Sequence, residues 1–208
     1  MCYRYVSHNP KQMTSNQHLK EYIHQFEELS SHETEEFANA FEEVIVKKRQ
    51  FIVQPGFTAQ YRHFVSEGAF RCYVVGDNGS DHTISFAIED WWITDYNSYI
   101  YQKPATMFVL ALEDSVILRI PYEKEHELKK ANHKFETIFR IMAERGLAFY
   151  QRRVTSNLTL SAEERYDNFM KRYAHIAQRL PQYALASFLG MTPEFLSKIR
   201  NNKVHKKS

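Results

Sequence analysis

The chain has 208 residues, of which 43% are hydrophobic, 14% aromatic and 25% charged, and its formal net charge is +2. That composition is typical of a folded soluble protein, and no apolar run reaches the ~20 residues that a membrane span needs. Residues 1–9 lack the apolar core of a signal peptide. The two cysteines, Cys2 and Cys72, form no CxxC or cluster, which argues against a disulfide framework or a zinc site. We therefore expect a cytoplasmic protein with no membrane partner.

Charge is distributed unevenly along the chain. Residues 161–208 hold nine Lys or Arg against four Asp or Glu, whereas residues 1–160 hold eighteen against twenty-one. A basic end on an acidic body is typical of a nucleic-acid-binding terminus. A solvated basic end without a ligand would show the same bias, so charge alone does not decide between the two.

The first two thirds of the chain indicate helices followed by strands. Residues 15–43 are predicted to form two short helices, because apolar residues recur there at helical spacing, with the polar run 32–36 as the break. From residue 44 to 121, β-branched and aromatic residues are cut by turn signals at a spacing typical of a sandwich or barrel. The predicted strands are 44–46, 51–53, 59–64, 70–75, 82–88, 98–100, 107–111 and 115–120.

Residues 123–153 are predicted to form one long helix, followed by a short connector at 154–160. The helix carries two apolar stripes, one of them at heptad-like spacing. A helix with two stripes can bury one on its own domain and the other on a partner, so we expect a homodimer; packing within a single domain is the alternative. The residues expected at the dimer seam are Leu128, Phe135, Ile138, Met142 and Phe149.

The tail contains the signature of two helices joined by a tight turn. Ser161 and Glu164 form a capping box for a preceding helix. Gly190 fits the residue after a helix end, where a positive φ is needed, and Thr192 fits the N-cap of the next helix, with Pro193 at its first position. Two short helices meeting across a glycine turn are the helix-turn-helix pattern.

The second helix of this pair has one polar face. Phe195, Leu196 and Ile199 are predicted to face inward, which leaves a polar face suited to the major groove, where carboxylate, ammonium and amide groups can read base edges. An ordinary helical hairpin with a merely solvated outer face is the alternative. The expected DNA-binding residues are Thr192, Glu194, Ser197, Lys198, Arg200, Asn201 and Lys203.

The order of these elements resembles the CRP/FNR family of bacterial regulators, across nearly the full chain. The front of the family pattern matches FEELSSHETEEFANAFEEVIVKKRQFIVQPG and FVSEGAFRCYVV, and the tail matches AEERYDNFMKRY and RLPQYALASFLGMTPEFLSKIRNN. The tail looks most like members from Bacteroidetes-type bacteria. The resemblance implies a cyclic-nucleotide-binding β-roll, a long dimer helix and a C-terminal helix-turn-helix.

The sequence departs from the family at the nucleotide pocket. The family uses a Gly-Glu pair for the ribose and an Arg followed by a small residue for the cyclic phosphate. Here the two stretches read FAIEDWWITDY, with Glu89 but no preceding Gly, and QKPATMFV, with Pro104 in place of the Arg. A phosphate without a fork of donors loses its strongest contacts, so we do not expect cyclic AMP to bind, and no cofactor is predicted.

Aromatic residues concentrate at the same place, at positions 91, 92, 96, 99 and 101. They either fill the former nucleotide pocket, which would give a ligand-independent protein, or line a pocket for another small molecule. The residues expected around this effector pocket are Glu89, Asp90, Trp91, Trp92, Tyr99, Lys103 and Thr106.

We interpret the chain as an α+β protein with three parts: an antiparallel β-roll with N-terminal helices (1–122), a dimerisation helix (123–153) and a helix-turn-helix domain (154–208). The expected function is a dimeric, non-enzymatic transcription regulator, with double-stranded DNA, a second copy and RNA polymerase as partners. The alternative is a ligand-binding or metal-dependent cupin-like barrel enzyme whose C-terminal helices are a protein-interaction surface. A metal cupin needs two His one residue apart, whereas His63 and His82 are well separated.

Overall fold

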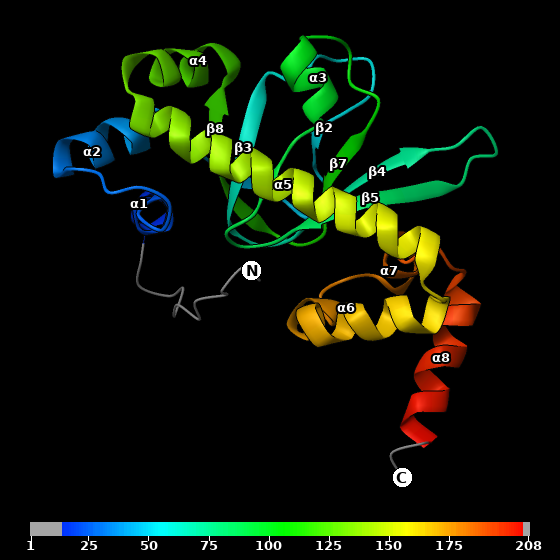
Figure 1. Cartoon of the computed structure of the whole chain (residues 1–208). Coiled ribbons are helices and arrows are strands. Elements are labelled where there is room, and N and C mark those ends of the chain that lie inside the picture. Colours follow the sequence, from blue (N-terminus) through cyan, green and yellow to red (C-terminus); the bar gives the residue numbers. More distant parts are fainter. Residues whose placement is uncertain (1–13, 206–208) are drawn as a thin grey trace.

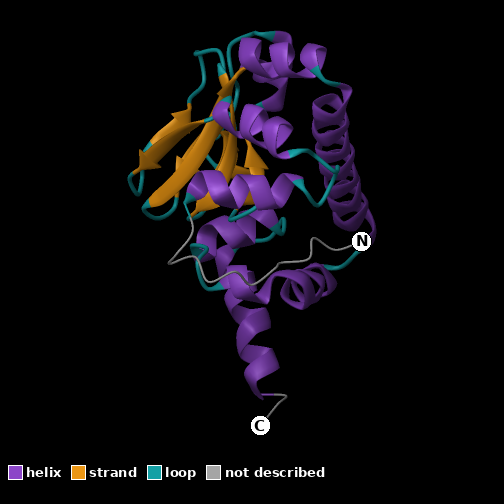
Figure 2. Cartoon of the chain, turned by 90° about the vertical axis from the view of Figure 1, so that its left-hand side faces the viewer, coloured by secondary structure: helices purple, strands orange, loops and turns teal. Residues whose placement is uncertain are grey.

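The computed structural model describes residues 14–205, so Cys2 and residues 1–9 lie outside the described residues. Two antiparallel sheets form a roll, one in the order β1-β8-β3-β6 and the other in the order β2-β7-β4-β5. Figure 1 shows the elements in chain order, and Figure 2 shows helices along one side of the strands and below them. The strands are β1 Glu42–Val46, β2 Phe51–Val53, β3 Tyr61–Glu67, β4 Phe70–Val75, β5 Asp81–Ala87, β6 Trp92–Ile93, β7 Phe108–Ala111 and β8 Ser115–Pro121.

The first sheet is apolar on both faces, which explains why it is covered on both sides. Successive side chains of a strand point to opposite faces. On β3, Phe64 therefore packs against the helices, while Val65 packs between the two sheets. On β8, Leu118 and Ile117 divide in the same way. The predicted antiparallel β-roll is confirmed.

One predicted strand is wrong. Residues 98–100 lie in the short helix α3 Tyr96–Tyr101, and the pairing of β6 with β3 was not predicted. The side chain of Asp95 caps α3 by accepting the N–H of Ser98 at 3.1 Å. Aromatic residues favour strands only on average, and a cap of this kind overrides that preference.

The two N-terminal helices are α1 Ser15–Ile23 and α2 Ser31–Asn39. The predicted break at residues 32–36 is wrong, because Ser30 and Glu33 form a capping box that begins α2 there. Polar residues in the first turn of a helix are therefore part of the start signal rather than a break. Leu19 of α1 and Phe37 of α2 are fully buried against the outer face of the first sheet and the long helix.

The predicted long helix is two helices, α4 Tyr122–Ala131 and α5 His133–Thr159. Asn132 interrupts them with an extended backbone (φ −149°, ψ 123°), and its side chain caps α5 by accepting the N–H of Lys134. The predicted connector at 154–160 is also wrong, because α5 continues to Thr159. With 27 residues, α5 is about 40 Å long. No helix within residues 14–205 combines the length and apolar character that crossing a membrane requires.

Three helices complete the chain: α6 Ala162–Ala177, α7 Gln182–Phe188 and α8 Pro193–His205. The predicted capping box of Ser161 and Glu164 begins α6. These helices form a core of their own that also includes Phe86 and Ile88 from the roll. In Figure 1, α8 extends away from the roll at the lower end of the molecule.

Candidate DNA-binding hairpin and effector site

The turn between α7 and α8 has the geometry that the sequence predicted. Gly190 has a φ of +67°, and the N–H of Met191 reaches back to the carbonyl of Ala186 at 3.0 Å. The Thr192 hydroxyl accepts the N–H of Phe195 at 3.2 Å, which caps α8. Arg165 of α6 donates its Nε–H to the carbonyl of Leu189 at 2.8 Å. Both ends of the turn are therefore fixed by side chains.

The inner face of α8 is only partly as predicted. Leu196 and Ile199 are buried against α6 and α7, as expected. Phe195 is 43% exposed, so its prediction as an inner residue is wrong. Ala186 is fully buried, and its small side chain lets the two helices approach closely.

The outer face of α8 exposes five of the seven predicted DNA-binding residues. Thr192, Glu194, Lys198, Arg200 and Asn201 are exposed. Glu194, Lys198 and Asn201 follow each other at i, i+4 and i+7, so they form one stripe along the helix. Hydrogen bonds from its own backbone N–H and from Thr192 lower the pKa of Glu194, so this carboxylate is charged at neutral pH.

The other two predicted DNA-binding residues are engaged within the protein. The Ser197 hydroxyl donates to the carbonyl of Pro193 at 3.0 Å and also accepts from Gln182 of α7. Lys203 pairs with Asp167 of α6 at 2.5 Å. Ser197 therefore ties α8 to α7, and Lys203 ties the end of α8 to α6, so neither belongs to the exposed stripe.

The hairpin docks onto the β-roll of the same chain. Ser187 of α7 accepts the backbone N–H of Thr83 at 2.8 Å and donates to the carbonyl of Asp81 at 3.0 Å, so it continues the edge of β5. Arg153 of α5 donates to the carbonyls of Thr83 and Phe188 at 2.8 and 3.2 Å. These contacts hold α7 against the roll while α8 extends away from it.

A second tie comes from the loop between α6 and α7. Arg179 lies between two carboxylates of the roll, with a bidentate pair to Glu89 and a further contact to Glu113. The hydrogen bonds that it donates to Glu89 are the largest cause that raises the pKa of this guanidinium, although burial opposes them. Glu89 also accepts the backbone N–H of Gly68 at 2.8 Å. Gly68 has a φ of +104°, and a Cβ there would lie 2.1 Å from the Ser115 hydroxyl, so glycine is required.

The residues predicted for an effector pocket do not converge on one cavity. Glu89 is committed to Arg179, and Asp90 pairs with His18 of α1 at 2.6 Å. Trp91 packs edge-on against Phe149 and Tyr173, whereas Trp92 lies in the helix-side core. These four side chains therefore do not gather at one site, and an effector pocket at these positions stays a prediction.

The remaining three predicted residues are also dispersed. The hydroxyl of Tyr99 donates to the buried carboxylate of Glu125 on α4 at 2.9 Å. Lys103 and Thr106 are exposed, and Thr106 contributes its backbone N–H to another residue, Asp95. Figure 1 places α3 and its flanking loop at the top of the roll. Of the predicted aromatic residues, Tyr99 thus ties α3 to α4 at this end of the molecule.

Asp95 is the residue that sequence reasoning missed. Its carboxylate is fully buried and accepts three backbone N–H groups, from Ser98, Thr106 and Met107, at 3.1, 2.9 and 3.1 Å. Converging backbone N–H groups form an anion site, and here a carboxylate of the chain itself occupies it. The pattern of an Asp three residues before a Ser, typical of a helix N-cap, was the available signal.

Buried side chains of the roll interior, Tyr150 and Cys72, lie near Asp95. Tyr150 of α5 hydrogen-bonds Ser85 of β5, and burial raises its pKa. The thiol of Cys72 contacts the sulfur of Met107 at 3.5 Å, and burial raises the pKa of this thiol to about 12. Cys72 is therefore an unreactive core residue.

The face of α5 that is free for a partner differs from the one predicted. Leu128, Phe135, Ile138 and Met142 are all buried in the core of their own chain, and Leu128 belongs to α4. Phe149 packs on Trp91. The first four of these residues cannot form the dimer seam, so the prediction is wrong for them, whereas Phe149 is only half-buried and stays a prediction.

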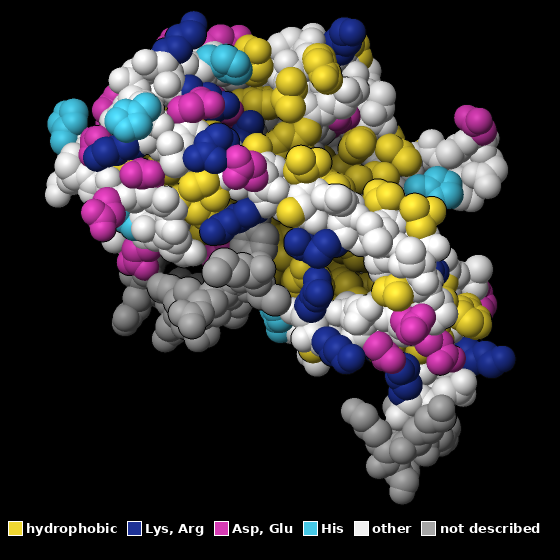
Figure 3. Space-filling model, in the orientation of Figure 1, with side chains coloured by type: hydrophobic (Ala, Val, Ile, Leu, Met, Phe, Trp, Pro, Cys, Tyr) yellow, Lys and Arg dark blue, Asp and Glu magenta, His cyan; other side chains and the backbone are white. Residues whose placement is uncertain are grey.

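A second stripe of α5 is exposed instead. Leu147, Val154 and Leu158 are 69%, 58% and 81% exposed. Positions 147, 154 and 158 follow one face of the helix, and the exposed Ala143 lies on the same face one turn earlier. Figure 3 shows apolar side chains gathered over the course of α5. An exposed apolar patch of this kind is typical of an interaction site.

No group of three or more His, Cys, Asp or Glu side chains within residues 14–205 is arranged to hold a metal ion. The two histidines considered for a barrel metal site lie on different sheets. His63 is buried on β3 and hydrogen-bonded to the carbonyl of Ile93, whereas His82 is exposed on β5.

Comparisons with known proteins agree with this architecture. Residues 43–132 match the cyclic nucleotide-binding domain family. No curated protein sequence matches the chain. Among solved structures, FixK2 from Bradyrhizobium japonicum superposes with a TM-score of 0.70 at 16% identity, over 80% of this chain and 85% of that one.

Two further structures have the same fold. A putative transcriptional regulator of the CRP/FNR family from Eubacterium rectale gives a TM-score of 0.66 at 15% identity, covering 85% of each chain. The catabolite activator protein of Thermus thermophilus gives 0.55 at 16% identity, covering 89% of this chain and 88% of that one. The resemblance seen in the sequence is therefore confirmed at the level of the fold, and the closeness to Bacteroidetes-type members stays a prediction.

Proposed function

We propose, on the premise of a cyclic nucleotide-binding-type roll joined to a helix-turn-helix in the CRP/FNR fold, that this protein is a dimeric transcription regulator that binds DNA in the cytoplasm. The structural neighbours include a protein named as a transcriptional regulator and one named as an activator, which supports a non-enzymatic function. The division at residues 122 and 153 stays a prediction, and so does RNA polymerase as a partner.

The exposed stripe of α8 is the observation that carries this proposal. Glu194, Lys198 and Asn201 project from one face of a helix that is fixed at its start by Thr192 and Pro193. A carboxylate, an ammonium and an amide can address cytosine, guanine and adenine edges respectively in the major groove. Arg200, which is also exposed, is placed to neutralise a phosphate. The basic character of residues 161–208 supports binding to a polyanion.

Dimerisation would use the exposed stripe of Leu147, Val154 and Leu158. Helices from two copies would bury this stripe around a twofold axis, as in a short coiled coil. The same axis would relate the two α8 helices. A pseudo-palindromic operator would then present half-sites about 34 Å apart, one helical turn of DNA.

The effector of this regulator is proposed to be something other than a cyclic nucleotide. The three N–H groups that converge beside α3 are already satisfied by Asp95, and the residue at the expected arginine position is Pro104. A cyclic phosphate would have to displace a buried carboxylate. Millimolar cyclic AMP is therefore expected to leave the melting temperature unchanged, and calorimetric binding at micromolar affinity would contradict this.

The test of DNA recognition is a selection from random duplexes, followed by binding measurements across a salt series. A regulator of this kind should enrich a palindromic motif, bind it more tightly than random sequence, and lose affinity steeply as salt rises. If no motif emerges and no binding is found at low salt, the hairpin is a protein-interaction surface instead, as in the alternative interpretation.

A further inference from the structure

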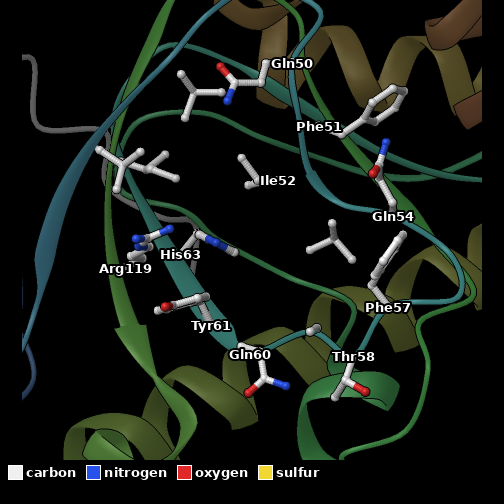
Figure 4. Close-up of a pocket in the computed structure, with 15 residues that line it drawn as sticks. Gln50, Phe51, Ile52, Gln54, Phe57, Thr58, Gln60, Tyr61, His63 and Arg119 are labelled. Atoms are coloured by element: carbon white, nitrogen blue, oxygen red, sulfur yellow. The ribbon is translucent and has the colours of Figure 1, made fainter.

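The β-roll contains a cavity that none of the predicted effector residues lines. It has a volume of about 320 Å³ and lies between the two sheets where β1 and β2 form their edges. Its walls combine apolar side chains of the strands with polar groups, of which His63, Tyr61 and Gln60 lie on one side in Figure 4. The carboxylate of Asp95 and its N–H groups are not part of this cavity.

His63 is the buried polar group that faces this space. Its side chain projects from β3 toward the cavity in Figure 4, and the residue is only 3% exposed. Nδ1 lies 3.1 Å from the carbonyl of Ile93, and since a carbonyl can only accept, Nδ1 carries the proton. Burial, together with the positive charge of Arg119, lowers the pKa of His63 to about 4. The ring is therefore neutral at physiological pH, and Nε2 is its hydrogen-bond acceptor.

The charge next to His63 is already balanced. Arg119 and His63 are register partners on β8 and β3, and Arg119 is in turn the partner of Glu42 on β1. The guanidinium pairs with the Glu42 carboxylate at 2.9 Å and lies 4.3 Å from the centre of the Tyr61 ring. Because Glu42 neutralises Arg119 at the rim, the described lining favours an uncharged ligand over an anion.

We propose that this cavity binds a small, uncharged, mostly apolar molecule through an O–H or N–H group that donates to Nε2 of His63. The volume sets the size, because a cavity of about 150 Å³ holds benzene and one of about 320 Å³ has room for a two-ring aromatic. Val46, Val53 and Ile117 supply the apolar contacts, and His63 supplies the single directional one.

This inference deepens the proposed function, because such a molecule would be the effector of the regulator. The cavity walls include β1 and β8, and the opposite face of the same sheet contacts α1 and the long helix α5. Binding between the sheets would therefore act on the element that carries the proposed dimer stripe. Ligand binding is measured without DNA, so its failure leaves the DNA-binding proposal standing.

The experiment uses 2-naphthol and its near-isostere 2-methylnaphthalene as probes, titrated into the full-length protein by calorimetry. The two molecules have the same ring system, but 2-naphthol carries a hydroxyl donor where 2-methylnaphthalene carries a methyl group. One hydrogen bond to a buried acceptor is worth roughly a tenfold difference in affinity. We expect the wild-type protein to prefer 2-naphthol by about that factor, and 2-naphthoate to bind more weakly than 2-naphthol.

Two variants assign the preference to the cavity. His63→Phe keeps the ring and removes the acceptor, so it should bind both probes with similar affinity. Ile52→Trp fills the cavity from its half-buried wall and should abolish binding of both probes. Ile100→Phe, on the exposed side of α3, is the matched control and should change neither affinity. If His63→Phe does not fold, the wild-type preference and the Ile52→Trp loss decide the matter.

Four results would overturn the proposal. They are equal affinity of the wild-type protein for the two uncharged probes, a naphthol preference that survives in His63→Phe, binding unaffected by Ile52→Trp, and tighter binding of 2-naphthoate. The last would mean that Arg119 is available to anions despite Glu42.

Discussion

Arg179 holds the carboxylate of Glu89 in a bidentate pair, with Nη1 to Oε2 at 2.8 Å and Nη2 to Oε1 at 2.9 Å. Glu89 lies in the roll between β5 and β6, and Arg179 precedes α7, so the pair joins the proposed DNA-binding helices to the proposed effector domain. Both side chains are more than two-thirds buried. An ion pair of this geometry is stronger than a typical surface pair.

Arg179→Ala should destabilise the protein by about 1–3 kcal/mol in urea unfolding, because it leaves Glu89 and Glu113 facing each other without a cation. Arg179→Lys keeps the charge but loses the bidentate geometry, so its stability should lie between those of the wild type and Arg179→Ala. Lys124→Ala breaks an exposed pair with Glu127 and should cost less than 1 kcal/mol. Equal losses for Arg179→Ala and Lys124→Ala would contradict this.

The same pair has a pH signature. Burial raises the pKa of Glu89, but hydrogen bonds from Arg179 and from the N–H of Gly68 outweigh it, so the pKa is lowered from 4.5. The stability that Glu89 contributes is therefore full above pH 4.5 and is lost as the pH falls through the lowered pKa. Unfolding of Glu89→Gln should depend less on pH in that acidic range than unfolding of the wild type.

Lys198→Ala should weaken binding to the selected operator by about 1–3 kcal/mol and relax specificity at one position of each half-site, because Lys198 is proposed to read a base. Arg200→Ala should weaken all sequences alike and reduce the salt slope by about one. Lys130→Ala, an exposed change on α4, is the control. The measurement is binding to operator and scrambled duplexes across a salt series, and identical behaviour of all three variants would contradict the assignment.

Leu147→Glu combined with Leu158→Glu should give monomers in sedimentation at micromolar concentration, because the charges would be buried in the dimer interface without partners. Ile45→Glu changes another exposed apolar residue, 66% exposed on β1, and should leave the dimer intact. A wild-type protein that is already monomeric would refute the proposed assembly.

His63 should make the free energy of unfolding decrease as the pH is lowered from 6.5 to 4. Its folded pKa is lowered from 6.5 to about 4, so the unfolded chain takes up a proton in that window while the folded chain does not. The loss amounts to about 3 kcal/mol across the window. Urea unfolding of His63→Phe should lack this component, whereas an unchanged pH profile would show that His63 is accessible to protons in the folded state.

Asp95→Ala should destabilise the protein by about 2–4 kcal/mol, because three backbone N–H groups lose a buried acceptor. Asp95→Asn keeps one oxygen acceptor and should lose less. Asn97→Ala, an exposed position on α3, should cost under 1 kcal/mol in the same thermal or urea unfolding measurement. A loss for Asp95→Ala no larger than that of Asn97→Ala would mean that water replaces the carboxylate.

Local signals in the sequence were sufficient wherever neighbours in the chain determine the structure. The capping box of Ser161 and Glu164, the positive φ of Gly190 and the Thr192 cap all follow from residues within four positions of each other. The roll was predictable because its strands are short, apolar and regularly spaced. The same local information misled at residues 98–100, where the Asp95 side chain began a helix.

Long-range pairing could not be predicted in the same way. The partner of Glu89 is Arg179, which is 90 residues away in the chain. The sequence does not show this pairing, so the charge of Glu89 was equally consistent with binding a ligand. On the long helix, the stripe of Phe135, Ile138 and Met142 is the more apolar one, and for that reason its own core buries it. The weaker stripe at Leu147 and Leu158 is the one left exposed. A sequence shows that two apolar stripes exist, but the fold decides which of them faces outward.

The contact of Ser187 with the edge of β5 limits how freely the C-terminal helices could be exchanged between proteins. Phe86 and Ile88 of the roll complete the core beneath α6 and α7, and Thr83 supplies the N–H that Ser187 accepts. Helices grafted from this chain onto another roll would leave an apolar surface open and an edge strand unpaired. A chimera that takes its C-terminal helices from this protein would therefore have to include β5 and the turn after it as well.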